Sequence, residues 1–183
     1  MTPIHQSAML MAALAAMLML AVIRDMAHNR IDNAITFPGA VLAIGLHLSL
    51  SGWIGVGYAL SGLLVGLLVL LPFHLAGGMA AGDVKLMAAA GAYLGPLDAF
   101  WAGCWSLIAG GVMGLAVLTA KGGVRGGLFA SVRQFFTYAM TRVWVPPPAD
   151  SAAAHRFPYA AAIAGGGLAV VAWRYTRHAV VGA

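Results

Sequence analysis

Charged residues are scarce in this sequence, at 8% of 183 residues against 62% that are hydrophobic. Soluble domains are usually about one quarter charged, so this composition excludes an ordinary water-soluble domain and predicts a membrane protein. The single cysteine, Cys104, excludes an intrachain disulfide and a Cys-x-x-Cys metal site. Acidic residues are the scarcest charged groups, because there are only five, all of them aspartates, against ten Lys and Arg.

The basic residues give a net charge of +5, but they do not form a stripe with interleaved aromatics, so binding of nucleic acid is not predicted. They lie between apolar runs, where Lys and Arg set membrane orientation. Because the first cation, Arg24, follows the first apolar run, that run is predicted to be a retained helix with its N-terminus outside, not a removable signal peptide.

The apolar runs predict an all-α fold, a polytopic bundle of about six transmembrane helices in a single membrane-embedded domain over residues 1–183. The predicted helices cover about residues 7–23, 35–51, 54–73, 83–95, 98–120 and 157–173. Ser51-Gly52 predicts a turn, and Gly95-Pro96 ends the short fourth helix. Pairs of glycines four residues apart, such as Gly62 and Gly66, are expected to let helices pack closely.

Residues 121–156 are basic and predict a cytoplasmic loop that contains an amphipathic helix and binds anionic lipid headgroups. With six helices and an outside N-terminus, the inner segments hold eight Lys and Arg and the outer segments two. This distribution satisfies the positive-inside rule. It places Asp25 and Asp83 at the same, cytoplasmic face.

Ionisable groups near a bilayer are costly, so each aspartate is a candidate functional residue. Asp98 is interpreted as a helix cap, Asp150 as solvated, and Asp32 as a cap of the second helix. Asp25 and Asp83 differ because each lies where a helix meets the cytoplasmic interface, with Asp83 expected at an N-cap. From spacing alone two interpretations stay open: a catalytic pair, or two charges that only cap helices and anchor the interface.

A pair of carboxylates matters because peptide hydrolysis needs a base for the attacking water and an acid for the leaving amine. Two carboxyl groups a few ångströms apart share one proton, so one acts as base and the other as acid. Such chemistry needs no metal or cofactor, and none is predicted. His28 and His74 are expected in loops beside this pair, in a solvated interfacial role.

Three motifs carry a resemblance to a known family. Gly82-Asp83-Val84-Lys85-Leu86, after a Gly/Ala-rich loop, resembles the second aspartate motif of the type IV prepilin leader peptidases. Asp25 followed by Arg30-Ile31-Asp32-Asn33 resembles the first motif of that family, and Phe157-Pro158-Tyr159 is similar to its final-helix signature.

The resemblance implies a bacterial inner-membrane aspartyl endopeptidase that cleaves the short basic leader of prepilins and pseudopilins at the cytoplasmic face. Asp25 and Asp83 would be its catalytic residues, and Gly82, Lys85 and Asn33 would support the site or bind substrate. For Lys85 an equally open interpretation is a snorkelling anchor. The partners implied are the prepilin, membrane lipids and components of the pilus-assembly machinery.

The chain lacks the cysteine-containing insertion of the larger enzymes that also N-methylate pilins. It therefore resembles the compact, peptidase-only branch typical of tight-adherence (Flp) pilus systems. It departs from the family pattern where Gly-x-Gly-Asp is Ala80-Ala81-Gly82-Asp83 and where Ile-Pro-Asn is Ile31-Asp32-Asn33. If the first glycine needs a positive φ, alanine is disfavoured there.

Two other functions compete with the peptidase. A non-catalytic membrane subunit of a pilus or secretion assembly would carry the aspartate motifs without activity, and the altered glycine keeps this alternative open. A small proton-coupled transporter would place carboxylates in the middle of helices, whereas Asp25 and Asp83 lie at predicted helix ends.

Overall fold

The computed structural model describes residues 3–28, 30–76, 78–120 and 159–181, and every regular element in these ranges is an α-helix. The helices are α1 (Pro3–His28), α2 (Asn33–Leu75), α3 (Ala81–Leu94), α4 (Pro96–Ala120) and α6 (Ala160–Val181). The predicted all-α fold is therefore confirmed. The predicted basic loop at 121–156 lies outside the described residues.

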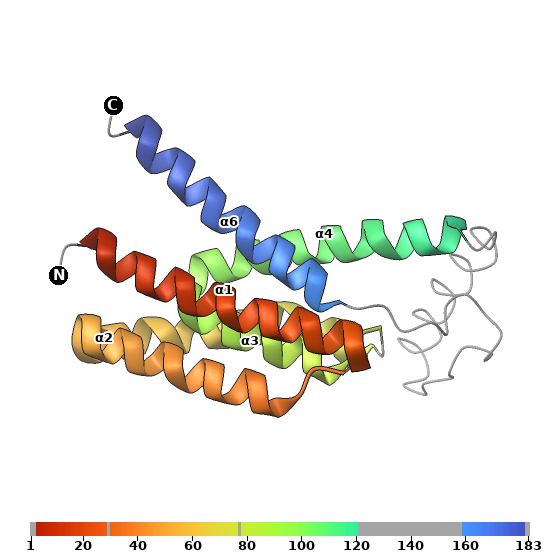
Figure 1. The fold of residues 1–183 in the computed structure, drawn as a ribbon, viewed down its shortest axis with the longest axis horizontal. Helices are drawn as coiled ribbons and strands as arrows, with labels where there is room; N and C mark the ends of the chain where they lie inside the picture. The colour runs from red at the N-terminus through yellow and green to blue at the C-terminus, as the bar shows by residue number, and fades with distance from the viewer. Residues whose placement is uncertain (1–2, 29, 77, 121–158, 182–183) are drawn as a thin grey trace.

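The chain reverses direction within α2 at Gly52, whose φ of 63° and ψ of −150° are not helical. Glycine adopts such a positive φ without strain. The rings of His47 and Tyr58 have centroids 5.7 Å apart, although 11 residues of straight helix would separate them by about 16 Å. The two arms of α2, residues 33–51 and 53–75, therefore fold back on each other (Figure 1). The predicted turn at Ser51-Gly52 is confirmed.

Helix α3 is the most buried element, since every residue from Asp83 to Gly95 except Lys85 is buried. It packs on the second arm of α2 through small residues. A Cβ at Gly62 would collide with the backbone of Gly91, and a Cβ at Gly66 would collide with the backbone of Met87. These contacts confirm the expected close packing, in which the missing side chains let two backbones approach.

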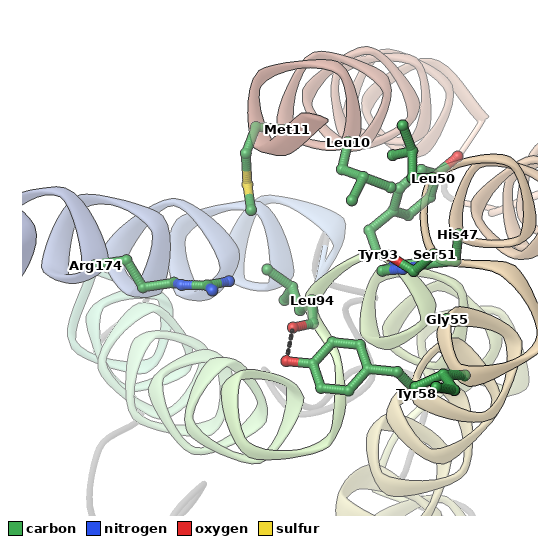
Figure 2. Close-up of a pocket in the computed structure, with 11 residues that line it drawn as sticks. Leu10, Met11, His47, Leu50, Ser51, Gly55, Tyr58, Tyr93, Leu94 and Arg174 are labelled. Atoms are coloured by element: carbon green, nitrogen blue, oxygen red, sulfur yellow. Dashed lines mark hydrogen bonds between the residues drawn. The ribbon is translucent and has the colours of Figure 1, made fainter. Parts of the chain in front are cut away.

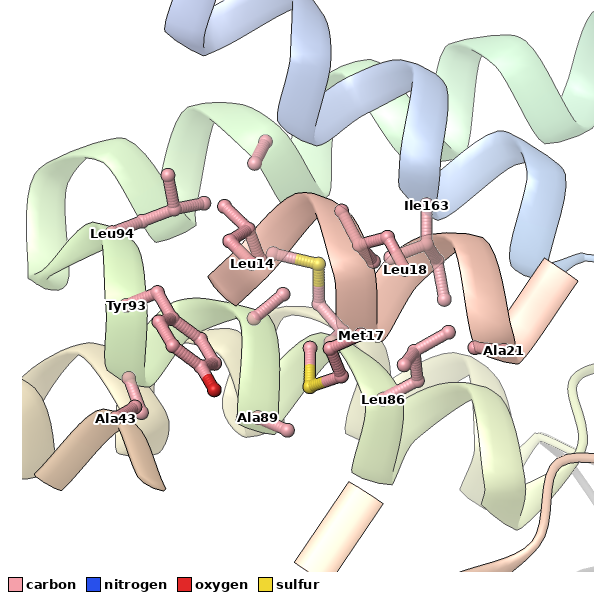
Figure 3. Packing of buried hydrophobic residues seen from close by; sticks show 14 of the residues in the cluster. Leu14, Met17, Leu18, Ala21, Ala43, Leu86, Ala89, Tyr93, Leu94 and Ile163 are labelled. Carbon is pink, nitrogen blue, oxygen red and sulfur yellow. The ribbon is translucent and has the colours of Figure 1, made fainter. Parts of the chain in front are cut away.

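Helices α1, α3 and α6 meet in a shared apolar core (Figure 3). Leu14, Met17 and Leu18 of α1 are each at most 5% exposed, and they pack with Leu86 of α3 and Ile163 of α6. The core thus fixes the side of α1 that faces α3.

Three segments are long and apolar enough to cross a membrane: Ala8–His28, Asn33–Leu75 and Pro96–Ala116. A shorter apolar helix covers Ala160–Arg174. Together these helices indicate a membrane protein, as predicted. The number of six crossings and the orientation of the chain stay predictions.

Candidate functional site

Asp25 lies in the last turn of α1 and is only 5% exposed. The buried residues Leu14, Leu18 and Ala21 precede it at intervals of four, three and four residues. Residues at this spacing share one face of a helix. The apolar stripe that packs α1 into the core therefore continues into a carboxylate and aims it at the interior of the bundle.

Asp83 is also buried, at 7% exposed, in the first turn of α3. The helix begins at Ala81, so the prediction of Asp83 as the N-cap is wrong, and Ala80 occupies that position. The Asp83 carboxylate instead reaches back and accepts a hydrogen bond from the Ala80 N–H at 3.3 Å. A third helical residue often satisfies the N-cap N–H in this way, so the local physical role is similar although the position is shifted.

The two carboxylates lie within electrostatic reach of each other. The pKa of Asp83 is raised from 3.8 to about 6, chiefly by burial and, to a smaller extent, by the charge of Asp25. The Ala80 N–H and the charge of His74 lower this pKa, but their effects are smaller. Asp83 therefore holds a proton more readily than an ordinary aspartate, as expected when two carboxyl groups face one another.

The predicted supporting residues gather beside Asp83, where the start of α2 meets α3. The Lys85 ammonium donates a hydrogen bond to the Asn33 side-chain oxygen at 3.0 Å. A Cβ at Gly82 would lie 3.1 Å from the Ile31 Cβ and 3.2 Å from the Ile31 carbonyl oxygen, so glycine permits a tight approach here. The structure therefore brings together Gly82, Lys85 and Asn33, which come from two motifs far apart in the sequence.

The alanine that replaces the first glycine of the motif is not strained. Ala80 has a φ of −76° and a ψ of 149°, an extended conformation that any residue adopts. The departure from the family pattern therefore costs the loop no backbone strain at this position.

The other aspartates do not join the pair. Asp32 stands at the N-cap position of α2, but its carboxylate makes no capping hydrogen bond and pairs with Arg24 at 3.2 Å on the surface. Asp98 lies in the first turn of α4 and pairs with Arg174 at 2.9 Å. Asp150 lies outside the described residues.

Two residues near the pair were missed or misjudged from the sequence. His28 and His74 were expected in loops but lie in the last turns of α1 and α2; His28 is exposed, whereas His74 is half-buried and its Nδ1 donates to the Met79 carbonyl at 2.9 Å. Ala160, the first residue of α6, donates its backbone N–H to the Asp25 Oδ2 at 3.0 Å. The motif Phe157-Pro158-Tyr159, just before Ala160 in the sequence, indicated that this segment matters. It did not predict the hydrogen bond between Ala160 and Asp25.

A comparison with family models matches residues 12–117, more than half of the chain, to the type IV leader peptidase family. The chain belongs to this family. The matched region contains Asp25, Asp83 and the residues around both, and it ends before α6. No curated protein and no solved structure matched the chain.

Membership of the type IV leader peptidase family identifies the protein as a peptidase of the prepilin-processing type. The described residues contain no group of three His, Cys, Asp or Glu side chains placed to hold a metal ion. The titratable groups that they do bring together are the two aspartates, with His74 and Tyr159 near Asp83.

A cavity of about 350 Å³ lies away from the aspartates of this family member, at the other ends of α1 and α3 (Figure 2). Leu10 and Leu94 line it together with His47, Tyr58 and Arg174. The Tyr58 hydroxyl donates to the Leu94 carbonyl at 3.3 Å on its wall. Because fifteen residues of helix separate Leu10 from Asp25, about 22 Å, this cavity is not part of the aspartate site.

Proposed function

We propose that this protein is an inner-membrane aspartyl endopeptidase that removes the short basic leader of type IV or Flp prepilins or pseudopilins. One observation carries the aspartyl assignment. Asp25 and Asp83, which are 58 residues apart in sequence and lie in different helices, are both buried, and the charge of Asp25 raises the pKa of Asp83. Membership of the type IV leader peptidase family supports the substrate class, a pilin precursor that carries a leader.

The pair supports a simple hydrolytic step. One carboxylate takes a proton from water as the water oxygen attacks the scissile carbonyl carbon. The protonated carboxyl then donates its proton to the leaving nitrogen as the carbon–nitrogen bond breaks. The reaction consumes one water and leaves the pair with one proton, ready for another cycle. With a pKa of about 6, roughly a tenth of Asp83 is protonated at pH 7, far more than for an ordinary aspartate.

The cytoplasmic location of the site is part of the proposal. Asp25 lies in the last turn of α1 and Asp83 in the first turn of α3, after the two arms of α2 have run out and back, so both stand at one end of the bundle. The positive-inside distribution of Lys and Arg favours the cytoplasm for that end. A leader with basic residues, which stays in the cytoplasm while the following apolar segment enters the membrane, would present its cleavage site there.

The test uses the full-length protein co-expressed with a prepilin. Asp25→Asn and Asp83→Asn, each alone, are expected to leave the prepilin at its unprocessed gel mobility. Asp98→Asn is the matched control, since Asp98 pairs with Arg174 and does not join the catalytic pair. Processing that persists in either Asn variant would refute the paired mechanism. Purified wild-type protein that never cleaves a prepilin peptide would favour a non-catalytic subunit.

A further inference from the structure

Asp25 is held from outside its own helix. Its Oδ2 accepts the Ala160 N–H at 3.0 Å across 135 residues of sequence, and both residues are buried. The first N–H groups of any helix have no partner within that helix. In α6 the Ile163 N–H donates to the Tyr159 carbonyl at 3.1 Å, so the ladder of the helix begins after Ala160. Asp25 therefore satisfies an N–H group that α6 itself leaves free.

Tyr159 docks the start of α6 on α4. Its hydroxyl donates to the Ser106 carbonyl at 3.0 Å. Its ring lies over Gly110, where a Cβ would collide with ring atoms. Farther along α6, a Cβ at Gly166 would collide with Ser106 and the Ala102 carbonyl, so the two helices stay close over several turns. The position of the Ala160 N–H is thus set by contacts between α6 and α4.

Tyr159 also lies within electrostatic reach of Asp83, the other member of the pair. Burial is the main cause that raises the pKa of its phenol, and the charge of Asp83 raises it as well. The phenol therefore stays protonated and able to donate to Ser106 while Asp83 titrates. One residue is in this way within electrostatic reach of Asp83 and adjacent in sequence to Ala160, whose N–H binds Asp25.

We propose that Tyr159 is a positioning residue of the peptidase, which anchors α6 on α4 so that the Ala160 N–H holds the Asp25 carboxylate in its working orientation. The inference rests on the proposed peptidase function. The N–H at a helix N-terminus also favours negative charge on the oxygen that it binds.

The kinetic test compares matched variants on a peptide with a basic leader followed by an apolar segment. Tyr159→Phe and Gly110→Ala are expected to lower kcat about tenfold or more with little change in KM, because small misplacements of a reacting group slow chemistry more than binding. Tyr58→Phe removes a similar hydroxyl-to-carbonyl hydrogen bond at the other end, and Gly111→Ala adds a methyl group in open space. Equal kcat in the test and control variants would overturn the proposal.

A second measurement does not depend on cleavage. Hydrogen exchange of the Ala160 amide, followed by NMR in detergent micelles, is expected to be at least about tenfold faster in Asp25→Ala than in Asp83→Ala, because only the first variant removes its acceptor. Equal exchange rates would overturn the contact itself. If the two variants show the exchange difference but the wild-type protein cleaves no prepilin, the proposed function is contradicted and the contact between Asp25 and Ala160 stands.

Discussion

Lys85 and Asn33 form a hydrogen bond of 3.0 Å between Nζ and Oδ1, although 52 residues of sequence separate them. Asn33 is the first residue of α2, and Lys85 lies two residues after Asp83 in α3. The bond therefore ties the segment that follows Asp25 to the helix that carries Asp83. The bond connects the two aspartate motifs, and whether Lys85 supports the site or only anchors the helix at the membrane surface stays a prediction.

A double-mutant cycle tests this tie. Lys85→Met keeps the length of the side chain without its charge, and Asn33→Ala removes the acceptor. Each is expected to slow prepilin cleavage severalfold, and the double variant is expected to be no slower than the worse single variant. Because the pair is exposed, the coupling free energy should be about 0.5–1 kcal/mol. If the rate losses of the two single variants multiply in the double variant, the two side chains act independently.

The pKa of Asp83 predicts how stability depends on pH. Because folding raises this pKa from 3.8 to about 6, the contribution of Asp83 to stability is complete below pH 3.8 and is lost as pH rises through 6. Asp83→Asn stays neutral, so it should be more stable than wild type at pH 8 by roughly 3 kcal/mol and similar to it at pH 3.5. Thermal unfolding in detergent at the two pH values measures the difference. An equal gain in stability of Asp83→Asn at both pH values would contradict the raised pKa of Asp83.

His74 provides a test of the same carboxyl through the rate. Its charge lowers the pKa of Asp83, so His74→Gln should raise that pKa and keep Asp83 protonated to higher pH. If cleavage needs this proton, the alkaline fall of the pH–rate profile moves upward, by less than about one pH unit. His28→Gln, an exposed histidine in the last turn of α1, is the control. A downward move, or the same move in the control, would exclude this role of His74.

Close packing between α2 and α3 predicts contrasting effects of two glycine substitutions. Gly62→Ala places a methyl group against the Gly91 carbonyl and the Gly95 backbone, so it should destabilise the fold by about 1–3 kcal/mol. Gly57→Ala meets nothing within 4 Å and should be neutral or slightly stabilising, because alanine favours helix. The midpoints of thermal unfolding report both effects. Similar midpoints for the two variants would mean that the helices separate at little cost.

Much of the fold was predictable because its signals are local. A glycine beside a serine marked the reversal at Gly52, and Gly95-Pro96 marked the end of α3, where Gly95 has a φ of 83°. Apolar length predicted the helices, with their ends within about five residues of the predicted ones, except that α6 runs to Val181 instead of ending at residue 173. Asp83 was placed at the N-cap because its side chain suits that position, but the third residue of a helix can reach the same N–H.

The site was predictable only in part. Asp25 and Asp83 stood out because carboxylates are rare in an apolar chain, and charge counting placed them at one face. The contact between Asp25 and Ala160 left no local signal, since any residue but proline offers a backbone N–H. The contact of His74 with the Met79 carbonyl depends likewise on how the segment after α2 folds back, which no short pattern encodes.

The reversal at Gly52 has a consequence for the chemistry at the far end of the bundle. A continuous helix of 43 residues would be roughly 65 Å long, and it would carry Asp83 to the opposite side of a bilayer from Asp25. One left-handed residue thus decides whether the two carboxyl groups share an aqueous compartment. A substitution at Gly52 is therefore expected to disturb the proposed catalytic pair from the far end of the bundle, without touching either aspartate.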